Sequence, residues 1–346
     1  MTSRVALVTG SLPPAPCGIG DYTERLASAL EKAGQPVEII CHRRWDALGT
    51  LEINRQLRRS NASILHFQYP TLGYGYSLGP HLCAFATGSI VTLHEFSAAH
   101  LARKMSVIPL TLRAPRVVMT SEFEARILAS RMPWLRNRLK VIPIGSNIAS
   151  LTYNPDESLK RIVYFGLIMP NKGIEDFIEF SRVLAATRPE VSTAIIGKVP
   201  PRHSAYARRL MEASQFDSVE WLLDRDAEDV SHLLSASTLS YLPFPDGASE
   251  RRGSLKAVCS IGLPCITTNS ADTPATLANA VLFASTPADA AGCALRLLAD
   301  ESERRRISQA AREYAQSFSW ERIADFHIQM YREAQASGAG LDPWLH

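Results

Sequence analysis

The sequence YLPFPDGASERRGSLKAVCSIGLPCITT, residues 241–268, places a polar loop between a short apolar run and a helix. The apolar run is typical of a buried strand, and the spacing of SLKAVCSI predicts a helix that begins at Gly253–Ser254 and stops at Gly262. The free N–H groups at that helix start, together with Arg251 and Arg252, favour a bound anion such as a phosphate. The same stretch is consistent with a surface loop that carries two solvated arginines. Its place in the chain therefore has to distinguish an anion-binding loop from an ordinary surface loop.

Length and composition indicate a folded protein of two domains. The chain has 346 residues, of which 46% are hydrophobic and 21% charged, with a net charge of +3. These values exclude a disordered chain and a composition typical of nucleic-acid-binding proteins. Residues 1–150 hold 17 Lys/Arg and 9 Asp/Glu, so the first half is basic and the second half acidic. We therefore expect an anionic partner for the first half.

The six cysteines form no CxxC pair and are interpreted as small buried residues of a cytoplasmic protein. The N-terminal apolar run is too short for a signal peptide, and the sequence predicts no membrane span.

The first half opens as a doubly wound α/β unit. Residues 4–10 form a strand pattern, a loop rich in Pro and Gly follows, and a helix is predicted from Asp21 to Gly34 with a capping box between Asp21 and Glu24. The glycines do not match the GxGxxG dinucleotide pattern, but Gly18 and Gly20 allow a ligand to approach the backbone.

Further strands of the first half are predicted at residues 63–70, 89–96, 116–123 and 139–146. Ligands bind at the carboxyl edge of open α/β sheets. The polar side chains expected at this edge are Gln68, His94, Glu95 and Ser121.

A second strand–helix cycle begins after a polar linker at Asn147–Lys160. Strands are predicted at residues 161–166, 192–197, 219–224, 238–244 and 280–285, and helices at 173–188, 227–235, 288–299, 301–318 and 321–333. The domains are therefore 1–150, 151–318 and a returning C-terminal helix in 319–346.

Five segments in this order resemble a large family of retaining nucleotide-sugar glycosyltransferases with the GT-B layout (family four type). They are PPAPCGIGDYTERLA, VTLHE, YFGLIMPNKGIEDFIEF, the opening stretch and FSWERIADFHIQMY. The resemblance implies two Rossmann-like domains that face a central cleft, with a C-terminal helix that crosses back to the first domain.

The sequence departs from the family pattern at two places. Leu167 follows Gly166 where the family usually has Arg, although the lysine of that motif is present as Lys172. The paired glutamates of the family fall at Ser249 and Ala257. We infer from charge that Arg251 and Arg252, with Ser254, take over part of the phosphate contact.

Sugar transfer needs positive charge at the leaving diphosphate and an acceptor hydroxyl held near the anomeric carbon. Lys172, Arg252 and the Gly253–Ser254 helix start are predicted to serve the first need. Because these cations supply the charge and no DxD-like pair is recognised at a strand end, no metal and no other cofactor is expected. By resemblance, His94 would contact the transferred sugar. The alternative is a structural histidine. Asp246 is the candidate for orienting sugar hydroxyls, or a residue that turns the Asp-Gly loop.

The donor is expected to be a UDP- or GDP-linked sugar. The acceptor is expected to be a sugar, glycolipid or other hydroxyl compound, bound on the side of Gln68 and Glu95, and no nucleic acid is expected. The alternatives are a catalytically silent GT-B protein and, with less support, an epimerase or phosphorylase of the same fold.

The segment His100–Arg116 mixes four basic residues with Ile108, Leu110 and Leu112. This pattern predicts weak association with an anionic membrane surface, or else an ordinary buried helix with a solvated basic edge.

Overall fold

The computed structural model describes residues 4–336 except residues 16, 43, 98, 147, 149, 150, 157, 216 and 272. It divides the chain into two compact units. Unit 1 comprises Met1–Gly145 and Phe318–His346, and unit 2 comprises Ser146–Ser317. Asn147, the first residue of the expected linker, and residues 337–346 of the expected C-terminal segment lie outside the described residues.

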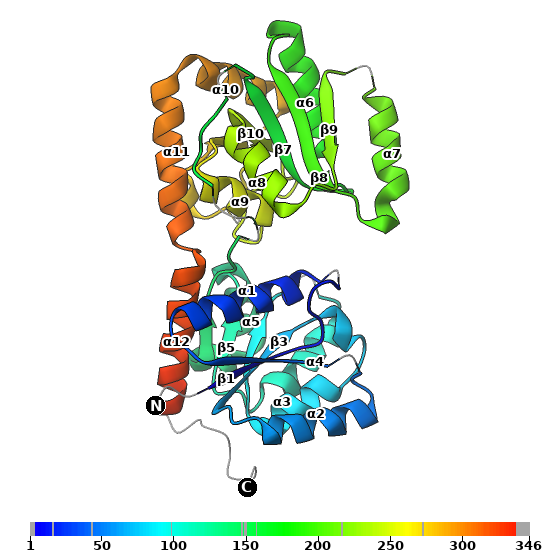
Figure 1. The fold of residues 1–346 in the computed structure, drawn as a ribbon, viewed down its shortest axis with the longest axis vertical. Helices are drawn as coiled ribbons and strands as arrows, with labels where there is room; N and C mark the ends of the chain where they lie inside the picture. The colour runs from blue at the N-terminus through cyan, green and yellow to red at the C-terminus, as the bar shows by residue number, and fades with distance from the viewer. Residues whose placement is uncertain are drawn as a thin grey trace. The chain divides into compact units, whose positions relative to one another are not determined.

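Unit 1 contains a six-stranded parallel sheet with the order β2-β1-β3-β4-β5-β6 (Figure 1). The strands are β1 (Val5–Thr9), β2 (Val37–Cys41), β3 (Ile64–Tyr69), β4 (Ile90–Leu93), β5 (Val117–Met119) and β6 (Leu139–Val141). The chain runs outward from β1 to β2 and then returns to β3 on the other side of β1. The strand order therefore reverses between β1 and β3, which is where ligands bind in open α/β sheets.

Helices cover both faces of this sheet. On one face, α1 (Gly18–Lys32) and α12 (Trp320–Ala336) share a core that includes Leu26, Leu30, Ile323 and Met330. The other face is covered by α2 (Ala47–Arg59), α3 (Gly79–Thr87), α4 (Leu101–Thr111) and α5 (Glu122–Arg131), with short turns η1 (Leu72–Tyr74) and η2 (Pro133–Arg138). The expected return of the C-terminal helix to the first domain is confirmed, because α12 completes the core under α1.

Unit 2 repeats the plan with the strand order β12-β11-β10-β7-β8-β9. Its strands are β7 (Arg161–Leu167), β8 (Ser192–Lys198), β9 (Val219–Leu223), β10 (Leu239–Leu242), β11 (Cys265–Thr267) and β12 (Leu282–Phe283). Its helices are α6 (Ile174–Thr187), α7 (Ser204–Ala213), α8 (Ala227–Ala236), α9 (Gly253–Ile261), α10 (Pro287–Ala299) and α11 (Glu301–Gln316), with turns η3 (Pro201–His203) and η4 (Ala275–Leu277). The strand order of this sheet reverses between β7 and β10.

The expected fold class, two doubly wound α/β domains, is confirmed, but two local predictions are wrong. Helix α1 begins at Gly18 with Cys17 as its N-cap, so Asp21 lies in the first turn and the capping box does not form. The strand expected at residues 116–123 ends at Met119, because Ser121 caps α5 by accepting a hydrogen bond from the Glu124 N–H. None of the described helices has the length and apolar character needed to cross a bilayer.

Candidate active site

The reversal of strand order in unit 2 brings two loops of the predicted donor site together. Lys172 lies in the loop after β7, and Asp246, Arg251 and Arg252 lie in the loop after β10. Strands β7 and β10 are parallel neighbours, with Leu239 opposite Ile162 in the register. Both loops therefore leave the sheet at its carboxyl edge, side by side.

Gly173 allows the two loops to touch. It adopts a φ of +77° at the N-cap of α6, and a Cβ atom built there would lie 1.7 Å from the Pro243 carbonyl oxygen. Only glycine satisfies both conditions, because an L side chain is strained at this φ and no space is available. The backbone beside Lys172 is thus fixed against the residue that follows β10.

Lys172 and Arg252 are electrostatic neighbours in this arrangement. Burial lowers the pKa of Lys172, and the positive charge of Arg252 lowers it further. Burial also lowers the pKa of Arg252, whose guanidinium contacts the Asp246 carboxylate and lies 4.6 Å from the centre of the Phe244 ring. The Tyr164 hydroxyl donates to the Lys172 carbonyl oxygen at 3.2 Å. Two cations are therefore held close together with one exposed carboxylate.

The first turn of α9 adds backbone donors to these cations. Arg252 is its N-cap residue, and no described side chain caps the helix start. Gly253 is exposed and has nothing within 4 Å of its Cβ position, whereas Ser254 is half-buried and Arg251 exposed. An anion beside Arg252 would gain the free N–H groups and the positive end of the helix dipole.

The residues at the motif positions of the family differ in how far they are buried. Gly166 lies within β7, where a Cβ atom would come within 3.0 Å of the Tyr164 hydroxyl, and Leu167 is 47% exposed. Ser249 and Ala257 are both buried. Ala257 belongs to the core, so no charged group replaces the family's second glutamate at that position.

Lys256, the neighbour of Ala257, is an unusual core residue. Its side chain is only 2% exposed, and burial lowers its pKa to about 7, with Glu250 partly offsetting that effect. The sequence indicated this burial, since a lysine falls among the apolar positions of SLKAVCSI. At neutral pH this amine is divided between its charged and neutral forms.

The reversal of strand order in unit 1 also joins two loops by close backbone contacts. The Gly10 N–H donates to Thr71 Oγ1 at 3.1 Å, and the Gly73 N–H donates to Ser11 Oγ at 2.8 Å. A Cβ atom at Gly73 would lie 1.6 Å from the Gly10 carbonyl oxygen. These contacts join the Gly- and Tyr-rich loop at residues 71–79 to the loop after β1.

Gly18 and Gly20 differ from the prediction that both open the backbone to a ligand. They lie in the first turn of α1, not in a loop. Gly18 is exposed with nothing within 4 Å of its Cβ position, whereas Gly20 is buried and a Cβ there would lie 2.7 Å from the Ser11 carbonyl oxygen. Gly20 thus serves the packing of the helix on its own preceding loop, and this packing sets the start of α1.

His94 and Gln68 meet at the carboxyl ends of β4 and β3. His94 Nε2 lies 3.0 Å from Gln68 Oε1. The backbone N–H of His94 donates to the Tyr69 carbonyl oxygen at 2.9 Å. Because an amide oxygen only accepts, Nε2 carries the proton and Nδ1 is left as an acceptor. Gln68 Nε2 is buried and has no partner among the described residues.

Burial lowers the pKa of His94 to about 3, with His327 of α12 contributing in the same direction. The His94 ring also packs edge-on against Tyr22, at 4.8 Å between ring centres. His94 is therefore a neutral, oriented hydrogen-bonding group at neutral pH. It is half-buried, which leaves part of the ring accessible.

Glu95 has an exposed side chain, and the residue that organises its loop is Glu124, which the sequence reasoning did not select. Glu124 is fully buried on α5 and accepts from the Phe96 and Ser97 N–H groups at 3.0 and 2.8 Å. The loop after His94 is therefore anchored by a carboxylate that is distant in sequence.

The described residues contain no group of three or more His, Cys, Asp or Glu side chains that could hold a metal ion. The premise that no DxD-like pair follows a strand is wrong, because Asp224 and Asp226 directly follow β9. Asp226 caps α8 by accepting from the Asp229 N–H at 2.8 Å. The absence of a metal requirement stays a prediction.

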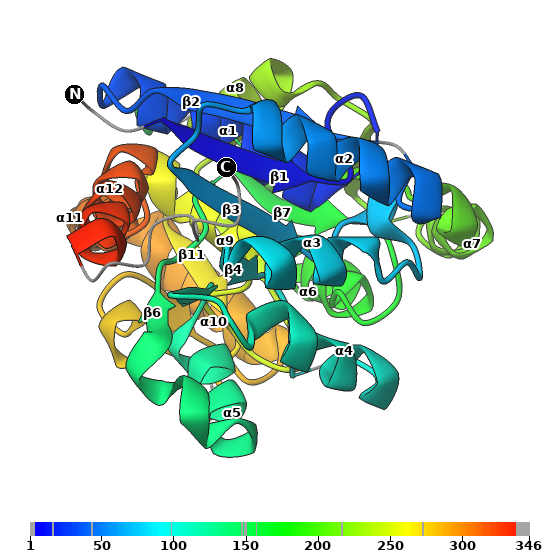
Figure 2. The same cartoon turned by 90° about the horizontal axis from the view of Figure 1, so that it is seen from below.

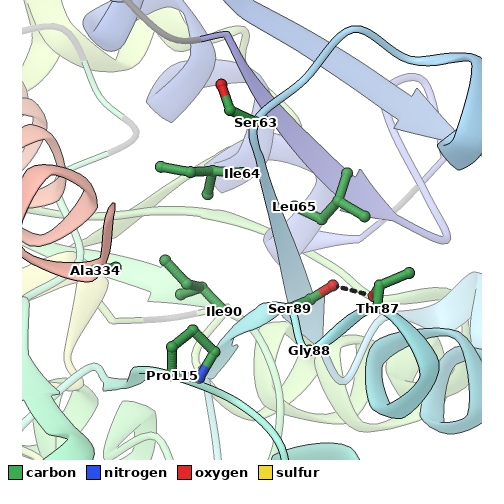
Figure 3. A pocket seen from close by; sticks show the side chains of 9 residues that line it. All are labelled: Ser63, Ile64, Leu65, Thr87, Gly88, Ser89, Ile90, Pro115 and Ala334. Atoms are coloured by element: carbon green, nitrogen blue, oxygen red, sulfur yellow. Dashed lines mark hydrogen bonds between the residues drawn. The ribbon is translucent and has the colours of Figure 1, made fainter. Parts of the chain in front are cut away.

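A small pocket lies at the opposite edge of the unit 1 sheet (Figure 3). It is lined by the first residues of β3 and β4, Ile64 and Ile90, and by Ala334 of α12. Its volume of about 10 Å³ corresponds to at most one water molecule. It is too small for a substrate.

Comparison with known proteins identifies the family. Residues 152–314, the greater part of unit 2, match the family described as glycosyl transferases group 1. Unit 2 therefore contains a group 1 glycosyltransferase domain. No curated protein sequence matches the chain.

Solved structures show the GT-B fold of this glycosyltransferase over almost its whole length. HepE of Anabaena, in complex with UDP and glucose, matches with a TM-score of 0.72 at 15% identity over 97% of this chain and 100% of its own. Sucrose-phosphate synthase of Thermosynechococcus elongatus matches with 0.68 at 19% identity, over 97% and 100%. WaaG, a glycosyltransferase of lipopolysaccharide biosynthesis, matches with 0.64 at 15% identity, over 94% and 99%.

Proposed function

We propose that this glycosyltransferase moves a hexose from a UDP- or GDP-linked donor to an acceptor hydroxyl in polysaccharide, glycolipid or natural-product assembly. The supporting observation is the pair of cations, Lys172 and Arg252, beside the uncapped start of α9. Two positive charges and free backbone N–H groups suit a diphosphate. HepE was solved with UDP-glucose, which favours UDP as the first nucleotide to test.

In the proposed reaction the bond between the anomeric carbon and the phosphate oxygen breaks, and the leaving diphosphate keeps the electron pair. Lys172 and Arg252 stabilise the charge that develops on that diphosphate. The acceptor oxygen forms the new bond on the same face, and its proton passes to the leaving phosphate oxygen. Retention of the anomeric configuration follows from this front-side attack.

We assign donor contacts to the loops around the two cations. Gly166, Gly253 and Ser254 are proposed to present backbone or hydroxyl donors to the diphosphate, with Arg251 in an outer position. Asp246 is proposed to orient sugar hydroxyls once the diphosphate has drawn Arg252 away from it. In this role the carboxylate accepts hydrogen bonds from the sugar.

In unit 1 we assign His94 to a hydroxyl of the transferred sugar, with Nδ1 as the acceptor. Gln68 is proposed to position His94, because its amide oxygen fixes the tautomer. Gly18, at the open first turn of α1, is proposed to offer its backbone N–H to the donor. Glu95 is proposed to contact the acceptor, since its carboxylate is exposed at the same strand end.

Incubation with UDP-, GDP-, ADP- and TDP-sugars and a panel of sugar and glycolipid acceptors tests this proposal. We expect one donor to give a new glycoside whose anomeric proton, by NMR, has the configuration of the donor. A product with inverted configuration would contradict the assignment. Nucleotide binding without product from any donor would favour the catalytically silent alternative.

A further inference from the structure

We propose that the outer face of α2, α3 and α4 in unit 1 binds an anionic phospholipid surface. This inference is independent of the sugar chemistry, because it concerns helices that cover the sheet and not its carboxyl edge. The three helices lie side by side over one face of the sheet, with α3 in the middle (Figure 2). Their inward residues, such as Ile53, Cys83 and Val107, share one core with the sheet.

The outward residues of these helices include many exposed apolar side chains. Six of the thirteen large apolar residues found exposed in the described part of the chain lie on these three helices. Leu48 and Leu51 on α2, Leu82 on α3 and Leu101 and Met105 on α4 are 57–75% exposed. Isolated exposed leucines are ordinary, but a concentration over adjacent helices marks an interaction surface.

The sequence expectation for this region needs one correction. Leu110, one of the apolar residues singled out in the segment His100–Arg116, is buried in the core. Leu112, which was also singled out, is 50% exposed, and within α4 the exposed apolar residues are Leu101 and Met105, one helical turn apart. The surface also extends over α2 and α3, which the sequence reasoning did not include.

The same face is basic. Helices α2, α3 and α4 carry five Lys/Arg and one acidic residue, Glu52. Arg55 and Arg59 are exposed and continue the outward line of Leu48 and Leu51 along α2. The Arg113 guanidinium lies 5.6 Å from the centre of the exposed Phe85 ring, which places a cation beside an apolar group.

The acidic residues nearest to this surface already contact basic groups. Asp46 pairs with Arg44 at 2.6 Å, and Glu52 with His42 at 3.3 Å. The combination of positive charge and exposed apolar side chains indicates which kind of partner binds this surface. A soluble polyanion would leave the leucines in water, whereas a bilayer interface accepts both, with lipid phosphates near the arginines and the leucines at the acyl boundary. A second copy of this face would bring like charges together.

Sedimentation of the full chain with vesicles tests the proposal. One vesicle set contains phosphatidylcholine only, and the other contains about one third phosphatidylglycerol. We expect at least 10-fold tighter binding to the anionic set, and a loss of affinity when salt is raised from 0.1 to 0.5 M. Equal binding to both sets, or no binding to either, would overturn the proposal.

Paired variants locate the surface. Arg55→Gln with Arg59→Gln should weaken binding about 30-fold, which corresponds to about 1 kcal/mol for each charge. Leu101→Ser with Met105→Ser should weaken it about 10-fold or more, because apolar area is lost. The matched controls are Arg208→Gln with Arg209→Gln on α7, where both arginines are exposed, and Leu159→Ser. The controls should bind as the parent does.

Thermal unfolding of each variant shows whether weaker vesicle binding comes from the altered surface or from a destabilised fold. Equal losses in the control and surface variants would contradict the assignment of the face. Self-association seen by light scattering, abolished by Leu101→Ser with Met105→Ser and accompanied by no vesicle binding, would replace the lipid surface with a second copy of the chain.

Discussion

The guanidinium of Arg252 contacts the carboxylate of Asp246, so one of the two proposed phosphate-binding cations has an internal anion as its partner. A donor diphosphate has to compete with that carboxylate. Asp246→Asn should therefore bind UDP about 3- to 10-fold more tightly, because the repulsion between carboxylate and diphosphate is removed. Isothermal titration calorimetry measures the change, and weaker UDP binding would show that Asp246 instead holds Arg252 in its binding position.

The contact between Gln68 and His94 gives a prediction for turnover. Gln68→Leu should lower kcat about 10- to 100-fold while UDP affinity stays unchanged, because the His94 ring loses the acceptor that fixes its tautomer. Nitrogen-15 NMR of the parent should show His94 protonated at Nε2. A proton on Nδ1, or an equal loss of UDP affinity, would remove Gln68 as a positioning residue.

Acid should destabilise unit 1 through its buried histidines. Burial lowers the pKa of His94 to about 3 and of His327 to about 4, and it also lowers the pKa of His66. The unfolded state binds protons below about pH 6.5 and the folded state does not, so stability is lost as pH falls from about 6.5 toward 4. Each histidine contributes a slope of about 1.4 kcal/mol per pH unit in that window.

Urea unfolding at pH 7 and pH 5, followed by hydrogen exchange in each unit, measures this loss. His327→Gln should reduce the slope of stability against pH, since the glutamine side chain does not titrate. A stability of unit 1 that is unchanged between pH 7 and pH 5 would contradict the account. The rate of sugar transfer should show no titration near pH 6.5 from His94, because that ring remains neutral.

Much of the fold follows from local pattern, and several site contacts do not. The strands, the start of α9 and the positions of Lys172 and Arg252 after strand ends could be predicted, because apolar runs and glycine stops are local signals. The contact of Gly173 with Pro243 requires the order of strands in the sheet, which no single segment encodes. The helix start at Gly18, which overrides the Asp21 capping box, follows instead from the packing of Gly20 against Ser11 in the preceding loop.

Contacts between residues that are far apart in the sequence could not be predicted from the sequence pattern. Glu124 accepts from backbone groups 27 and 28 residues away, and its own position looks like an ordinary acidic residue in the first turn of a helix. The pairing of Gln68 with His94 depends on the lateral spacing of β3 and β4. Which of Arg251 and Arg252 faces Asp246 depends on the loop backbone and not on residue type.

Lys256 should destabilise unit 2 at neutral pH. Its pKa of about 7 in the folded state lies below the usual 10.5, so the unfolded state binds the proton more strongly. Stability therefore rises with pH between about 7 and 10.5. Lys256→Met should raise the Tm of unit 2 at pH 7, and the gain should shrink as pH approaches 10. Calorimetric scans at pH 7 and pH 9.5 test this, and a lower Tm at pH 7 would show that the amine stabilises the fold.

Lys172 and Arg252 are proposed to bind the donor diphosphate together. Calorimetric titration of UDP and of uridine into the parent, Lys172→Ala, Arg252→Ala and Arg251→Ala tests this proposal. Each of the first two replacements should weaken UDP binding about 10- to 150-fold, because each removes a charge-assisted hydrogen bond of about 1.5–3 kcal/mol. Uridine should bind as before, and the matched control Arg251→Ala should cost less than Arg252→Ala. UDP affinity that is unchanged in both Lys172→Ala and Arg252→Ala would contradict the account.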